Sequence, residues 1–103
     1  MDLRSGYEKG MHVMKIEKEF VLREIADDFV IIPTGKTVLE FNGLISVNEV
    51  GASLWKMLQQ ETTFEALVKG ILDEYDVEED VVREDVYEFL HQLSDKGILD
   101  LQE

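Results

Sequence analysis

The residue types that most often carry chemistry are sparse in this sequence. It contains no cysteine, which excludes a thiolate nucleophile, a thiolate zinc site and a disulfide framework. His12 and His91 lie far apart, and neither sits in a metal-binding or nucleophile pattern. His91, on an expected helix, is interpreted as a structural or contact-making residue. We therefore expect a protein that is not an enzyme and that holds no cofactor and no metal ion.

Two short motifs resemble parts of binding sites. "TGKT" (34–37) matches the end of a phosphate-binding loop, but Val30 stands where that pattern requires its first glycine. A hairpin turn between two strands is the better interpretation. The acidic run "DEYDVEED" (73–80) lacks the central glycine and the ligand spacing of a calcium loop. Its carboxylates instead suit the positive N-terminal end of a following helix.

Charge and composition restrict the possible partners. The chain has 23 acidic and 10 basic residues, for a net charge of −13. This balance argues against nucleic acid and anionic membranes, because phosphate binding requires Lys and Arg to displace counterions. No apolar run approaches the ~20 residues of a membrane span, and no signal-peptide pattern opens the chain. The 45% hydrophobic and 32% charged composition is that of one small globular domain, and we expect it in the cytoplasm.

Three short apolar segments predict an antiparallel meander. They are residues 20–25, 29–33 and 37–41, and the second is apolar on both faces, which predicts the central strand. The third alternates Leu39 and Phe41 with Val38 and Glu40, and its outer edge is expected to be free. Residues 1–14 show no clean period and are expected to form a flexible N-terminal arm ahead of a single domain, 15–103.

Three helices are expected to follow, at residues 48–59, 62–75 and 78–96. The first is capped by Asn48, or by Ser46 with Glu49 as a capping box; the second opens with the box-like sequence "TTFE" (62–65). Gly97 ends the third. The expected core positions recur with helical spacing: Val50, Leu54, Trp55 and Leu58; Phe64, Leu67, Val68, Ile71, Leu72 and Tyr75; Val82, Val86, Phe89, Leu90 and Leu93. Strands followed by helices indicate an α+β domain.

One flank of the third helix has two interpretations. Arg83, Tyr87 and His91 recur at every fourth position and border the apolar stripe of that helix. They form either a solvated flank or a contact surface, and their spacing alone does not decide between the two.

The order of several segments resembles the PqqD-like family, named for pyrroloquinoline quinone synthesis protein D. The segments are "FVIIPTGKTVLEFNGLISVNEVGASLWKML", "TTFEALVKGILDEYDV" and "EDVYEFLHQLSDKGIL", within about residues 18–100. The resemblance rests on the spacing of Asn48 to Leu54 and Trp55, of Leu72, Tyr75 and Asp76, and of Asp85, Val86, Phe89 and Leu90. It implies a winged-helix-like fold of three antiparallel strands followed by three helices.

The resemblance also implies a function. Members of the family bind the leader segment of a ribosomally made precursor peptide and present it to a modifying enzyme, often a radical S-adenosylmethionine enzyme. The leader would add a strand beside the third strand and lie toward the third helix. Residues 42–55 are closer to the broad family than to the quinone-pathway protein. The expected peptide-binding residues are Thr37, Val38, Leu39, Glu40, Phe41, Arg83, Tyr87, Leu90 and His91.

Two other functions stay open at this point. A winged-helix fold also permits DNA binding, although the net charge opposes it. A free strand edge also permits a protein–protein adaptor or a homodimer.

Overall fold

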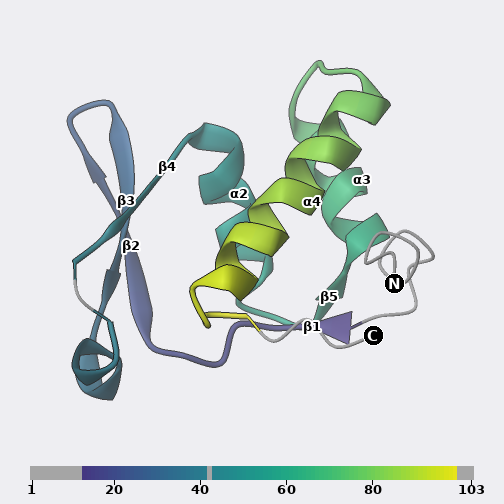
Figure 1. Cartoon of the computed structure of the whole chain (residues 1–103). Coiled ribbons are helices and arrows are strands. Elements are labelled where there is room, and N and C mark those ends of the chain that lie inside the picture. The colour runs from purple at the N-terminus through teal and green to yellow at the C-terminus, as the bar shows by residue number, and fades with distance from the viewer. Residues whose placement is uncertain (1–12, 42, 100–103) are drawn as a thin grey trace.

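The computed structural model describes residues 13–41 and 43–99, in which a three-stranded sheet lies on one side and the three α-helices lie on the other (Figure 1). The strands are β1 (Val13–Met14), β2 (Phe20–Ile25), β3 (Asp28–Pro33), β4 (Ile45–Val47) and β5 (Thr62–Thr63). The helices are the 3-10 helix η1 (Gly35–Leu39), α2 (Glu49–Met57), α3 (Phe64–Glu74) and α4 (Glu79–Asp95). A three-stranded antiparallel sheet with three α-helices confirms the expected α+β, winged-helix-like class.

The larger sheet has the strand order β2-β3-β4, and all of its pairs are antiparallel. Phe20 pairs with Pro33 at one end of the β2–β3 hairpin, and β4 pairs with β3 from Phe29↔Val47 to Ile31↔Ile45. Ile31 is fully buried, and Val30, which faces the other side of the strand, is 7% exposed. The predictions of the first two strands and of a central 29–33 strand are confirmed.

The prediction of a third strand at 37–41 is wrong. Residues Gly35–Leu39 form η1, and the third strand is β4, farther along the chain. The Thr37 hydroxyl, which is buried, accepts a hydrogen bond from the Glu19 amide at 3.0 Å, and the Thr37 amide bonds back to the Thr34 carbonyl at 3.1 Å. These bonds turn the backbone at Thr37. The link between β3 and the third strand is therefore longer than the expected hairpin turn.

Side-chain caps define where the helices begin. Asn48 Oδ1 accepts a hydrogen bond from the Gly51 amide at 2.7 Å, so Asn48 is the cap of α2. Thr63 Oγ1 accepts from the Ala66 amide at 3.1 Å at the start of α3. The expected box of Thr62 with Glu65 does not form, because Thr63 is the cap and Ala66 stands at the third helical position. The Glu65 carboxylate instead pairs with Arg83 of α4.

Gly97 ends α4 as expected. Its φ of +76° is a left-handed conformation that glycine adopts without steric cost. The Gly97 amide bonds to the Ser94 carbonyl at 3.0 Å, and the Ile98 amide bonds to the Leu93 carbonyl at 2.9 Å. This pair of bonds is the Schellman pattern, and it returns the buried side chains of Ile98 and Leu99 to the core.

The core lies where the three α-helices meet the inner face of the sheet. Every expected core position of the helices is buried or packed against the buried cluster. Trp55 stands edge-on to Phe20, with ring centroids 5.5 Å apart, and thereby joins α2 to β2. Phe64 is fully buried at the start of α3. Within the described residues, no helix has both the length and the hydropathy to cross a membrane.

The start of the described chain belongs to the small second sheet. Residues 1–12 of the expected N-terminal arm lie outside the described residues, whereas Val13 and Met14 form β1 and pair with β5. Met14 and Ile16 are buried, and the Ile16 amide bonds to the Leu58 carbonyl at 2.9 Å. The described chain thus enters the fold beside β5, away from the outer edge of β4 (Figure 1).

Leu67→Ala is expected to lower the free energy of unfolding by about 2–5 kcal/mol, because it removes a fully buried side chain and leaves a cavity. Chemical denaturation followed by circular dichroism measures this change. Lys69→Ala, at an exposed position of the same helix, is the control and should change the value by less than about 0.5 kcal/mol. A Leu67→Ala protein as stable as the parent would contradict the core described above.

Candidate functional site

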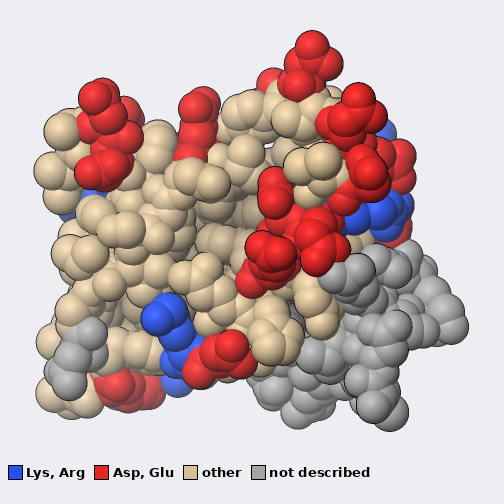
Figure 2. Space-filling model, turned by 45° about the horizontal axis from the view of Figure 1, so that its top comes forward, with Lys and Arg blue, Asp and Glu red and all other residues tan. Residues whose placement is uncertain are grey.

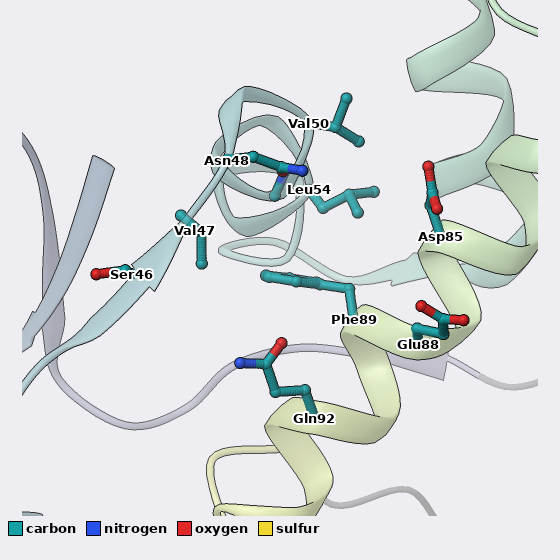
Figure 3. A pocket seen from close by; sticks show the side chains of 10 residues that line it. Ser46, Val47, Asn48, Val50, Leu54, Asp85, Glu88, Phe89 and Gln92 are labelled. Carbon is teal, nitrogen blue, oxygen red and sulfur yellow. The ribbon is translucent and has the colours of Figure 1, made fainter. Parts of the chain in front are cut away.

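A groove separates the outer edge of β4 from α4. Within the described residues β4 pairs with β3 alone, so its other edge has no strand partner. The groove is a hollow of about 270 Å³ between β4, the first half of α2 and α4 (Figure 3). We call it the β4–α4 groove, and it is lined by Ser46, Val47, Asn48, Val50, Gly51, Leu54, Asp85, Glu88, Phe89 and Gln92.

The floor of the β4–α4 groove is apolar. The Phe89 ring points from α4 toward β4, and Val50 and Leu54 project from α2 toward α4 (Figure 3). Val47 and Val50 are half-buried and Phe89 is 8% exposed, so these three offer apolar surface, whereas Leu54 is almost fully buried behind them. An apolar side chain of a bound molecule would lose contact with water on this floor, which is a favourable process.

Gly51 determines how closely the groove walls approach each other. A Cβ atom at this position would lie 3.0 Å from Val47 Cβ and 3.3 Å from Phe89 Cε1. The absence of a side chain therefore lets α2 begin directly against β4 and against the Phe89 ring. Asn48, which caps α2, holds this first turn in place.

Carboxylates mark the helical wall. Asp85 and Glu88 stand on α4 at the rim of the groove, and both are exposed (Figure 3). Figure 2 shows acidic residues gathered over the helical side of this face, across from a sheet side on which uncharged residues dominate. The groove thus combines an apolar floor with one acidic wall.

A second hollow, of about 210 Å³, lies at the other end of β4. Its lining residues include Phe41, Leu44, Ile45 and Lys96. Ile45 is the first residue of β4, and Lys96 lies one helical turn beyond Gln92. The second hollow and the β4–α4 groove therefore follow the same side of β4 and α4.

The structure separates the two groups of residues predicted to bind a peptide. Thr37, Val38 and Leu39 belong to η1, which lies apart from α4 in Figure 1. Glu40 pairs with Lys18 at 3.1 Å. Phe41 is the residue of this group that borders the second hollow, and its ring stands 5.4 Å from that of Phe20.

Arg83 is directed toward α3 and away from β4. Its guanidinium donates two hydrogen bonds to the Glu65 carboxylate, at 2.7 and 2.8 Å, and one to Glu79 at 2.9 Å. The hydrogen bonds from Arg83 lower the pKa of Glu65, against the opposing effect of partial burial. The hydrogen bonds to Glu65 and then Glu79 raise the pKa of Arg83. Arg83 therefore ties α4 to α3.

The other predicted residues of α4 occupy two different environments. Leu90 is 1% exposed and belongs to the core, so it presents no accessible surface. Tyr87 and His91 have ring centroids 5.9 Å apart, and His91 Nδ1 lies 3.4 Å from Asp95 Oδ2. Both rings border a shallow hollow that is also lined by Glu88, Gln92, Asp95 and Lys96. Contact between this flank and a peptide stays a prediction.

Sequence reasoning missed the residues of β4 and the groove wall of α4. "LISVN" (44–48) holds a weak signal, because Ile45 and Val47 alternate with an exposed Ser46 just before a helix cap. Asp85 and Gln92 border the same apolar stripe as Tyr87 but on the opposite side. The sequence pattern treats the two borders alike, and only the packing of α4 shows which one meets the sheet.

Comparisons with known proteins agree with this architecture. The family described as "Coenzyme PQQ synthesis protein D (PqqD)" matches residues 19–99. A solved chain described as "TbiB1 in Complex with the TbiA(beta) Leader Peptide" is similar in structure, with a TM-score of 0.68 and 28% sequence identity. That similarity covers 87% of this chain and 99% of the solved one. The curated proteins contain no match.

Glu65→Gln is expected to lower the free energy of unfolding at neutral pH by up to about 1 kcal/mol, since the paired side chains of Glu65 and Arg83 are 39% and 29% exposed. The pKa of Glu65 is lowered in the folded state, so its pairing stabilises the fold above the unfolded-state pKa near 4.5 and is lost as the pH falls through the lowered value.

Urea denaturation of both proteins from neutral to acidic pH measures this difference. Glu61→Gln, at an exposed position, is the control and should show little difference at any pH. A cost of Glu65→Gln that stays constant into acid would contradict an ionic role for this pair.

Proposed function

The chain belongs to the PqqD family, and on this premise we propose that it is a non-catalytic module that captures the leader segment of a ribosomally made precursor peptide. The similar chain TbiB1 was solved in complex with a leader peptide, which supports the same class of ligand here. The observation that carries the proposal is the open edge of β4, which faces α4 across an apolar floor.

The peptide binds by adding a strand to β4. An edge strand presents backbone donors and acceptors that an extended peptide satisfies, whatever its side chains. Side chains of the added strand alternate between its two faces, so every second one turns toward α2 and α4. Val47, Val50 and Phe89 receive these side chains, while Gln92 flanks them.

The free-energy balance assigns a large share of the affinity to these side chains. Ordering about six peptide residues costs about 6–12 kcal/mol of backbone entropy. β4 is three residues long, and about three new backbone hydrogen bonds return only about 1.5–4.5 kcal/mol. Two or three buried apolar side chains, at about 1.5–3 kcal/mol each, supply the remainder. Recognition therefore needs both the strand edge and the apolar floor.

The bound leader is then presented to a modifying enzyme. The resemblance of the sequence to the PqqD-like family makes a radical S-adenosylmethionine enzyme the candidate partner. Because the peptide lies on an edge of the sheet, its two ends leave the groove freely, and the segment to be modified extends beyond this domain. We propose that the protein acts in the cytoplasm, where a precursor peptide is made.

The electrostatics of α4 oppose the winged-helix alternative of DNA binding. Its sequence carries six carboxylates and one arginine. That arginine already pairs with Glu65 and Glu79. A helix of this kind repels phosphates and has no free arginine with which to displace their counterions.

Gln92→Trp is expected to weaken peptide binding at least tenfold, because its indole would fill the β4–α4 groove beside Phe89. The probe is a peptide selected on the full chain from a displayed random library of about 11 residues, a length that spans the 35 Å molecule at about 3.3 Å per residue. Fluorescence anisotropy of the labelled peptide gives the Kd.

His91→Trp is the matched control, because it adds the same ring to the hollow beside Tyr87, which Gln92 also lines, and not to the β4–α4 groove. This variant should bind as tightly as the parent protein. If His91→Trp blocks the peptide, whether or not Gln92→Trp also does, the leader lies on the Tyr87–His91 flank. A library that yields no binding peptide would contradict the proposed function itself.

A further inference from the structure

The carboxylates of α4 fall into two groups that differ in their partners. Glu79 pairs with Arg83, Asp95 lies beside His91, Asp80 accepts a hydrogen bond from the Val81 amide, and Glu84 also has an interaction partner. Asp85 and Glu88 have no ion-pair or hydrogen-bond partner among residues 13–41 and 43–99. These two line the β4–α4 groove, so no described residue neutralises the negative charge of its acidic wall.

The opposite wall of the groove supplies no positive charge. It consists of Ser46, Val47, Asn48, Val50, Gly51 and Leu54, all of them uncharged. The Asn48 amide oxygen is already used by the Gly51 amide. A cationic side chain on the bound peptide would therefore meet two carboxylates that have no partner within the described part of the chain, and no cation among the residues that line the groove, which favours it electrostatically.

The charge changes sign from the β4–α4 groove to the second hollow. Asp85 and Glu88 lie at the Val47 end of β4, whereas Lys96 lines the second hollow beside Ile45. Lys96 follows Asp85 by 11 helical positions and Glu88 by eight, or about 12–17 Å at 1.5 Å per residue. An extended peptide covers this length with about four or five residues.

We infer the direction of the peptide from an added strand that continues the antiparallel pattern of the sheet. Both strand pairs of the β2-β3-β4 sheet are antiparallel. A peptide that continues this pattern beside β4 places its N-terminal part near Val47 and its C-terminal part near Ile45. Its first residues then lie beside Asp85 and Glu88, and its last residues lie beside Lys96.

We propose that the groove selects leader peptides in which a Lys or Arg precedes the apolar anchor residues and an Asp or Glu follows the cation by about four or five residues. This inference rests on the proposed function, since it specifies the ligand of the same groove. Asp85 and Glu88 recognise the cation, Phe89 and Val50 receive the anchors, and Lys96 recognises the acidic residue.

The test is a selection of displayed random peptides on the full chain, repeated on Asp85→Asn/Glu88→Gln. Peptides enriched on the parent should share a Lys or Arg before an apolar pair, and this positional preference should disappear on the variant. One enriched peptide should bind the variant about two- to tenfold more weakly at low salt, because exposed charge pairs contribute modestly. Its charge-reversed analogue should bind the parent more weakly to a similar extent.

Glu17→Gln/Glu61→Gln is the matched control, because it makes the same change in net charge at exposed positions near β1. It separates local recognition from general attraction to an acidic protein and should leave the preference intact. Lys96→Glu should convert the preferred acidic residue to a basic one.

The outcomes distinguish the two proposals. Peptides that lose binding to Gln92→Trp but show no fixed position for a cation would overturn the charge pattern and leave the groove as the leader site. An equal loss of peptide affinity in Asp85→Asn/Glu88→Gln and in the control Glu17→Gln/Glu61→Gln would also contradict the charge pattern. Peptides that bind Gln92→Trp and the parent equally well would contradict the assignment of the β4–α4 groove as the leader site. This inference would then fail with that assignment.

Discussion

Three elements converge at Gly51, and the geometry of the groove depends on that contact. A side chain there would press against Val47 of β4 and Phe89 of α4 at once. Because none is present, the capped start of α2 lies against both, and β4 and α4 form two walls of one groove. The width of the groove is therefore a consequence of core packing, which tolerates little displacement.

The same packing makes the fold and the binding surface inseparable. Phe89 and Leu54 belong to the buried cluster and also form the floor of the groove. Arg83 and Glu65 hold the first turns of α4 against α3, which orients the opposite flank toward β4. A rigid floor has an advantage for a short strand edge, because the protein loses little conformational entropy when a peptide orders on it.

Most of the fold was predictable from the sequence, because apolar periodicity and helix caps depend on residues that are close together in the chain. The two long strands, the three α-helices, Asn48 and Gly97 were read correctly. Residues 37–41 were not, because the alternation of Val38, Leu39, Glu40 and Phe41 is too short to separate a strand from a 3-10 turn fixed by the Thr37 hydroxyl. The predicted site combined residues 37–41 with the Arg83–Tyr87–His91 flank of α4, and the structure places most of the first group in η1. Which border of a helix meets a sheet is a tertiary property, so the sequence pattern did not indicate β4 and the Asp85–Gln92 border as an alternative site. Peptide contact with the predicted flank stays a prediction.

Peptide recognition, as proposed, requires that the peptide joins the sheet at the free edge of β4. NMR of the isotope-labelled chain with an unlabelled selected peptide tests it most directly, through nuclear Overhauser effects between α-protons of neighbouring strands. We predict such effects between the peptide and Ile45–Val47, with side-chain effects to Phe89. Effects confined to the outer edge of β2, or to Tyr87 and His91 with none to β4, would contradict it.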